Sequence, residues 1–157
     1  MDMLNAPFQM DYADFVAAVP GAAKGLTTLG AAAVDGGLEK DLLELVKLRA
    51  SQLNGCAYCL QYHLNVGRKL GIAQVKFDLL AAWRDAGIYT VREKAALAWT
   101  EALTLIACHE VSETLSAEVA KEFPGLQIAL LTSAVATINA WNRIAGALRF
   151  KPPIAAG

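Results

Sequence analysis

The segment that most constrains the fold spans residues 44–63, where two helical patterns meet at an Asn-Gly break. Asn54 and Gly55 both tolerate the positive φ that ends a helix, and an asparagine can also cap the helix that follows. The segment therefore predicts two consecutive helices that form a hairpin. The second of these helices begins with two cysteines and a histidine.

The spacing of these three residues places them on one side of the second helix. Cys56 and Cys59 are three residues apart, and His63 follows Cys59 by four, so the side chains form one stripe. Two cysteines this close can form a disulfide with little backbone movement. The helix N-terminus favours a thiolate at Cys56, whereas the imidazole favours one at Cys59. The spacing predicts a redox site and leaves open which thiol attacks.

Glu44 lies in the first helix among leucines and a valine, so its carboxylate is predicted to be partly buried. If the helices form a hairpin, Glu44 can face the stripe and orient or protonate His63. The alternative is a surface carboxylate paired with Lys47.

Glu44, the Cys56-Ala-Tyr-Cys59 segment and His63 together resemble the active-site signature of the alkyl hydroperoxidase D (AhpD) family, within the wider carboxymuconolactone decarboxylase group. The downstream segments 83–84, 92–97 and 138–143 also look like the small single-domain branch of that family. The resemblance covers roughly residues 38–148. It implies a trimer or a higher multiple of three, such as a hexamer.

The resemblance also implies residue roles. Cys59 would be the peroxidatic thiolate, Cys56 the resolving thiol, and His63 with Glu44 the proton relay. Peroxides would be the substrates, and a dithiol protein or small thiol would reduce the resulting disulfide. No metal, haem or flavin is implied. The expected site is therefore a self-contained cysteine peroxidase.

One position departs from the family pattern. Members with peroxidase chemistry commonly carry a second histidine between the cysteines, and here Tyr58 takes that place. A phenol with a pKa near ~10 is a poor base at neutral pH, so the relay is shorter. Tyr58 and Tyr62 flank the cysteines and are candidates for lining a substrate entrance, with plain packing as the alternative.

Glycine, proline and cap residues divide the rest of the chain into helical segments, and no segment has the pattern of a strand. We therefore predict one all-α domain over residues 1–157, with a helical arm at 1–37 and the family core at 38–148. Asn139, Asn142 and Arg143 are predicted to tie the last helix to the site helices or to another subunit. The predicted helices cover residues 11–18, 22–34, 38–54, 56–70, 72–85, 90–106, 112–122 and 126–150.

Composition bears on partners and compartment. Hydrophobic residues make up 55% of the 157 residues and charged residues only 18%, which predicts apolar faces buried between subunits of a homo-oligomer. The net charge of −1 gives no electrostatic reason to expect nucleic acid or an anionic membrane as partner. No signal-peptide pattern or membrane-length apolar run is visible, so we expect a cytoplasmic protein.

Three other functions fit parts of the pattern. A dithiol–disulfide oxidoreductase with weak peroxidase activity fits the replacement of a histidine by Tyr58. A non-catalytic helical scaffold or zinc protein would use the same cysteines and histidine, with Cys108 and His109 as further ligands. The lactone decarboxylase branch is disfavoured, because its chemistry does not call for a cysteine pair.

Overall fold

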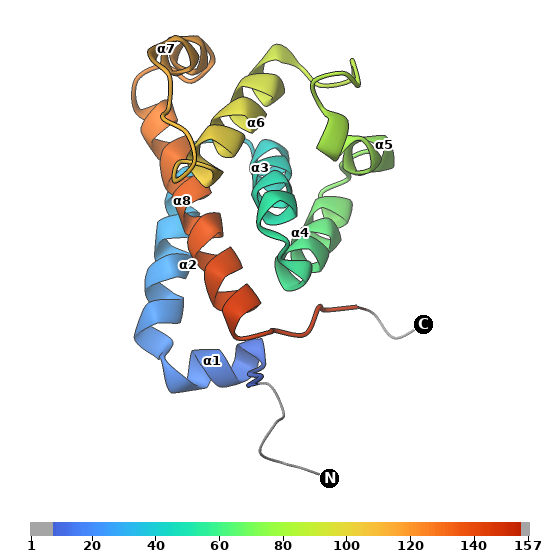
Figure 1. Ribbon diagram of the computed structural model, residues 1–157, viewed down its shortest axis with the longest axis vertical. Coiled ribbons are helices and arrows are strands. Elements are labelled where there is room, and N and C mark those ends of the chain that lie inside the picture. Colours follow the sequence, from blue (N-terminus) through green and yellow to red (C-terminus); the bar gives the residue numbers. More distant parts are fainter. Residues whose placement is uncertain (1–7, 155–157) are drawn as a thin grey trace.

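The computed structural model describes residues 8–154, which are helical and contain no strand (Figure 1). This confirms the all-α prediction; residues 1–7 of the predicted arm and 155–157 lie outside the described part. The helices are α1 (Tyr12–Ala18), α2 (Pro20–Asp35), α3 (Lys40–Asn54), α4 (Ala57–Lys69), α5 (Gln74–Asp78), the 3₁₀ turn η2 (Leu80–Ala82), α6 (Val91–Thr104), α7 (Glu113–Glu122) and α8 (Leu126–Ala147).

Helix α3 lies at the centre of the bundle and packs against α4, α6 and α8, while α2 runs beside α8 (Figure 1). Its leucines and valine point to more than one side and are almost completely buried. Each fully buried side chain of this size contributes roughly 1.5–3 kcal/mol of hydrophobic stabilisation. The helix that carries Glu44 is therefore the most firmly embedded element of the site. Its buried apolar residues include Leu42, Leu43, Leu45, Val46 and Leu48.

Two predicted boundaries were wrong. The first helix ends at Ala18, before Pro20, as predicted, but the second begins at Pro20 rather than at residue 22, because the missing N–H of proline costs nothing at the first helical position. The predicted helix at 72–85 is split into α5 and the 3₁₀ turn. Phe77 of α5, Leu80 of the 3₁₀ turn and Trp83 just after it are all buried, so the segment still packs one face against the bundle.

The start of α6 was predicted correctly. Thr90 accepts a hydrogen bond from the Glu93 N–H, and the Glu93 side chain accepts one from the Thr90 N–H, which completes a capping box. Ser112 caps α7 in a similar way, through the Leu115 N–H. These caps account for the agreement between the predicted and observed helix starts.

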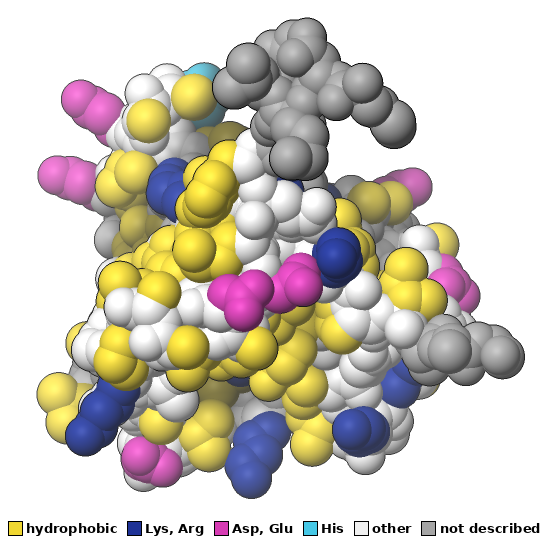
Figure 2. All heavy atoms as spheres, turned by 90° about the horizontal axis from the view of Figure 1, so that it is seen from below, with side chains coloured by type: hydrophobic (Ala, Val, Ile, Leu, Met, Phe, Trp, Pro, Cys, Tyr) yellow, Lys and Arg dark blue, Asp and Glu magenta, His cyan; other side chains and the backbone are white. Residues whose placement is uncertain are grey.

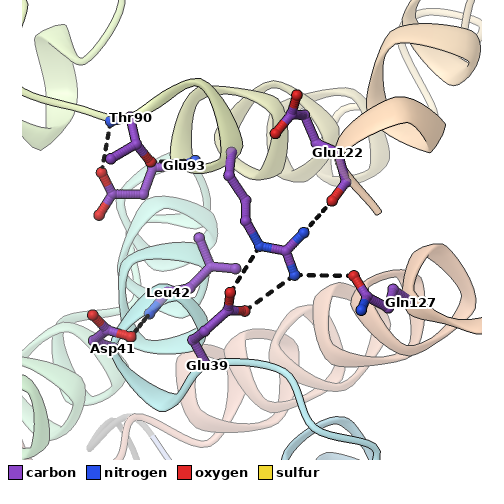
Figure 3. A network of polar contacts seen from close by, with 8 residues as sticks. Glu39, Asp41, Leu42, Thr90, Glu93, Glu122 and Gln127 are labelled. Carbon is purple, nitrogen blue, oxygen red and sulfur yellow. Dashed lines mark hydrogen bonds and ion pairs between the residues drawn. The ribbon is translucent and has the colours of Figure 1, made fainter. Parts of the chain in front are cut away.

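One guanidinium joins four helices (Figure 3). Arg92 of α6 donates to both carboxylate oxygens of Glu39, the N-cap residue of α3, and to the side chain of Gln127 in α8. It also donates to the carbonyl of Glu122 at the end of α7 and lies over the Phe123 ring. The hydrogen bond from Arg92 outweighs partial burial and lowers the pKa of Glu39. Arg92 thus fixes the end of the bundle far from the cysteines.

Hydrophobic side chains are spread over the face seen from below, where α1 lies (Figure 2). Large apolar side chains are exposed on this and other parts of the described chain, among them Tyr12, Tyr62, Val91, Ile106 and Leu126. No single described helix combines the length and apolar character needed to cross a membrane; only α7 and α8 taken together reach them, with a bend of 112° between the two.

Candidate redox site

A left-handed glycine makes the turn between α3 and α4. Gly55 has φ 64° and ends α3, and the N–H of Cys56 donates back to the carbonyl of Ser51. A side chain at this position would be strained by roughly 1 kcal/mol. The predicted break at Asn54 and Gly55 is therefore confirmed, although Cys56 rather than Asn54 takes the N-cap position of α4.

The two cysteines are joined by a disulfide with their Cα atoms 5.4 Å apart. Cys56 has extended backbone angles, and its Sγ accepts a hydrogen bond of 3.2 Å from the N–H of Cys59 in the first turn of α4. Both residues are nearly buried, at 2% and 3% exposure. Cys56 thus receives the electrostatic benefit of the helix N-terminus directly.

A polar network fixes this turn against α8. The Nδ2 of Asn142 donates to the Oγ of Ser51, which itself donates to the carbonyl of Lys47. The side-chain amide of Asn54 donates to Asn142 and to Asn139. Because buried polar groups need partners, these bonds specify how α8 sits on the turn. The predicted tie between the last helix and the site helices is confirmed for Asn139 and Asn142.

Whereas Asn139 and Asn142 bond to α3, Arg143 forms its hydrogen bonds within its own helix. Its Nη1 donates to the carbonyl and to the side-chain oxygen of Asn139, one turn earlier in the same helix. Within the described chain, Arg143 makes no hydrogen bond or ion pair to the site helices, and it supports the network through Asn139.

Glu44 lies at the centre of the site's charged groups. Its Oε2 is 2.7 Å from His63 Nδ1, and its Oε1 is 2.7 Å from Lys47 Nζ. Glu44 thus contacts His63, as the hairpin prediction required, and also Lys47, but it is buried rather than on the surface as the alternative held. Burial to 4% exposure opposes the charged carboxylate, but the hydrogen bond and charge of His63, with those of Lys47, outweigh it and lower the pKa of Glu44. The carboxylate is ionised at neutral pH and orients the imidazole.

A cavity of about 400 Å³ opens beside Cys59 and His63. Cys59, His63 and Lys47 lie on its wall together with the two tyrosines suggested by the sequence. The remainder of the wall is mostly apolar and comes from α2 and α8. Those residues are Leu26, Thr27, Gly30, Ala31 and Val34 from α2, and Ala134, Thr137, Ile138, Trp141 and Ala145 from α8.

Aromatic rings form one side of this cavity. Tyr58 stacks between Tyr12 and Tyr62, with ring centroids 5.9 and 6.1 Å apart, and Tyr62 meets His63 edge-on. Burial, reinforced by Tyr12 and Tyr62, raises the pKa of Tyr58 to about 12. Burial also raises the pKa of Tyr62, with Tyr12 and Glu44 adding to it. Both phenols are therefore neutral under ordinary conditions and act as hydrogen-bonding and packing groups.

Sequence reasoning missed two parts of this site. Tyr12 comes from α1 and the small residues Gly30 and Ala31 from α2, a helix whose Ala- and Gly-rich sequence carries no chemical signal. A Cβ built at Gly30 would lie 3.4 Å from the Thr137 side chain, in ordinary van der Waals contact, so α2 and α8 pack directly against each other here. The one feature of the sequence that pointed to the packing of α2 on α8 was the run of glycines and alanines in α2.

Within residues 8–154, no group of three or more His, Cys, Asp or Glu side chains is placed to bind a metal ion. Cys108 is an exposed free cysteine in the loop after α6.

Comparison with known proteins places the chain in a class. It matches the carboxymuconolactone decarboxylase family over residues 20–102, more than half of its length, and therefore belongs to that family. Its fold is that of the AhpD-like proteins of this superfamily, as the sequence resemblance indicated.

Three individual proteins are similar to the chain over two thirds or more of its length. The uncharacterized protein YdfG of Bacillus subtilis (strain 168) is 38% identical over 105 residues, which are 67% of this chain and 71% of that protein. A crystal structure from Agrobacterium tumefaciens, of a protein of unknown function provisionally assigned to antioxidant defence as AhpD, has a TM-score of 0.86 and 32% identity, covering 94% of this chain and 99% of that one. An uncharacterized peroxidase-related protein from Ralstonia eutropha with an alkylhydroperoxidase AhpD core shares the fold, with a TM-score of 0.75, 23% identity and coverage of 88% and 74%.

Proposed function

We propose that the protein is a cysteine peroxidase that reduces organic or hydrogen peroxides through the Cys56–Cys59 pair. The observation that carries the proposal is the position of Cys59 on a cavity wall that also holds His63, whose imidazole is hydrogen-bonded to buried Glu44. A thiol, a base and a group that orients the base are the parts an activated cysteine nucleophile requires.

The first step forms a sulfenic acid. With Nδ1–H donated to Glu44, the Nε2 of His63 is free to accept the thiol proton of Cys59. The thiolate attacks the terminal peroxide oxygen and the O–O bond breaks. The departing alkoxide then takes from the imidazolium the proton that came from the Cys59 thiol. Thiol and hydroperoxide thus become sulfenic acid and alcohol.

The second step forms the disulfide. The thiol of Cys56 attacks the sulfenic sulfur of Cys59 and a water molecule leaves. The Cys59 N–H that points at Cys56 Sγ, together with the start of α4, favours the Cys56 thiolate as attacker. An external dithiol then reduces the disulfide by two exchange steps and is itself oxidised to a disulfide.

Thiol counting tests this function. We expect reduced protein carrying Cys108→Ser to lose both remaining thiols on addition of one equivalent of cumene hydroperoxide, because the thiolate and its resolving partner are preassembled. Free thiols are counted with a chromogenic disulfide after rapid quenching. Slow loss of thiols with peroxide but fast exchange with a small disulfide would instead identify a dithiol–disulfide oxidoreductase. The neutral phenol of Tyr58, a poor base, favours this alternative.

Glu44→Gln is expected to slow peroxide-dependent thiol loss by about 10²-fold, because a neutral amide no longer stabilises the imidazolium formed in the first step. The amide oxygen can still accept a hydrogen bond from His63 Nδ1. The substitution should therefore weaken the stabilisation of the imidazolium charge more than it changes the orientation of the ring. Stopped-flow oxidation of the reduced Cys108→Ser protein measures the rate, and Glu118→Gln, an exposed change on α7, is the control. An unchanged rate in Glu44→Gln would remove Glu44 from the relay.

The same proposal includes a homo-oligomer, a trimer or hexamer, in the cytoplasm. The exposed Val91, Ile106 and Leu126 side chains support association, because isolated small domains rarely leave this much large apolar surface in water. A dithiol protein or small thiol is the proposed reductant.

A further inference from the structure

Charges are scarce around the cavity beside Cys59. On its wall, α1 contributes Tyr12, and α4 contributes His63 and the phenols of Tyr58 and Tyr62. The lining residues of α2 and α8 include no ionisable side chain. From α3 come Lys47, on the wall, and Glu44, which touches both Lys47 and His63. Among these lining residues, Lys47 is the one that carries a permanent positive charge at neutral pH.

Lys47 is also fixed in place. It lies one turn after Glu44, its Nζ is 2.7 Å from Oε1, and its side chain is only 23% exposed. Both oxygens of the buried carboxylate are thereby occupied, one by the ammonium and the other by the imidazole. The backbone of Lys47 is held as well, since its carbonyl accepts the Ser51 hydroxyl within the network that anchors α8.

We propose that Lys47 is a positioning residue of the redox site: through Glu44 it sets the orientation of His63 and the charge balance under which Cys59 loses its proton. The proposal concerns the same site as the proposed function and rests on it. With the ammonium at Oε1, the carboxylate is turned so that Oε2 meets Nδ1, and the negative charge of Glu44 is partly offset. An unbalanced carboxylate beside the cavity would oppose a second anion on Cys59.

The proposed role predicts the direction in which the pH midpoint of Cys59 reactivity moves. Removing a fixed positive charge disfavours every anion nearby, so Cys59 should need a higher pH to become a thiolate. A neutral side chain at position 47 is expected to move the midpoint of Cys59 reactivity upward by about one pH unit, which lowers the thiolate fraction about tenfold below the midpoint. Arginine keeps the charge and should keep the midpoint near that of the parent protein.

The experiment measures alkylation of Cys59 by iodoacetamide across pH, without peroxide, in reduced Cys56→Ser/Cys108→Ser protein. Lys47→Met and Lys47→Gln remove the charge, Lys47→Arg keeps it, and Lys40→Met removes an exposed lysine from the first turn of the same helix. Two neutral replacements are used so that poor folding of one, seen by circular dichroism, still leaves the other. Loss of packing alone would change the melting temperature but not the pH midpoint.

An upward shift in Lys47→Met or Lys47→Gln, with Lys47→Arg and Lys40→Met close to the parent, supports the proposal. A midpoint that does not move, or one that moves equally in Lys47→Arg, overturns it. Peroxidase activity is measured separately on the protein that retains Cys56. Failure of that activity alone would contradict the proposed function, whereas an unmoved alkylation profile would contradict only the role of Lys47.

Discussion

Cys59→Ser is expected to abolish peroxide-dependent oxidation, lowering the rate by about 10³-fold or more, because a serine hydroxyl is not ionised by a neighbouring imidazole at rest. Of the two paired cysteines, Cys59 is the one on the cavity wall, so a peroxide in the cavity meets this sulfur. The measurement is consumption of hydroperoxide with excess dithiol, in a Cys108→Ser background.

Cys56→Ser is the matched variant and should behave differently. Its first reaction with peroxide should remain fast and should leave a sulfenic acid on Cys59 that a dimedone probe traps, whereas no intramolecular disulfide can follow. Turnover with dithiol should fall because resolution is lost. If Cys56→Ser stopped the first reaction while Cys59→Ser allowed it, the assignment of the two thiols would be reversed.

Glu101→Ala is expected to lower the free energy of unfolding by about 3 kcal/mol. This is the lower end of the cost, roughly 3–5 kcal/mol, of removing one partner of a buried ion pair. Glu101 of α6 accepts hydrogen bonds from Arg49 Nε at 2.7 Å and Trp83 Nε1 at 2.8 Å, and its other oxygen is 2.6 Å from Arg84 Nη1. Arg49 is only 14% exposed and would be left nearly buried without its carboxylate.

The same group makes stability depend on pH. Burial opposes ionisation of Glu101, but hydrogen bonds from Trp83, Arg84 and Arg49 outweigh it and lower the pKa of this carboxyl. A depressed pKa stabilises the fold above the ordinary value of 4.5, and that stability is lost as the pH falls through the lower folded value. Urea titrations at neutral and acidic pH measure both effects. Glu118→Ala should stay within about 0.5 kcal/mol of the parent, and an equally small change in Glu101→Ala would contradict the prediction.

Local sequence patterns predicted several helix boundaries and one contact of the site. The left-handed turn at Gly55 and the capping box at Thr90 are encoded by two to four neighbouring residues, so they can be recognised without the fold. The contact between Glu44 and His63 could be expected as well, because two helices joined by a short turn bring such positions together.

The cavity could not be predicted in the same way. Tyr12 reaches Tyr58 across 46 residues of chain, and the α2 wall depends on how closely that helix approaches α8. The helix predicted at 72–85 is interrupted at Leu79, where α5 gives way to the 3₁₀ turn, and no local residue pattern marks this change. Neither feature could therefore be predicted from neighbouring residues alone.

The cysteines are only three positions apart, and this has a consequence for the whole molecule. In a chain-entropy description, closing so short a loop removes about 2 kcal/mol of freedom from the unfolded chain, against about 4.7 kcal/mol for a loop of 100 residues. Breaking the bond therefore changes the balance between folded and unfolded chains only modestly. A cysteine pair of this spacing can therefore pass between its disulfide and dithiol forms at less than half the cost in stability that a disulfide closing a long loop would impose.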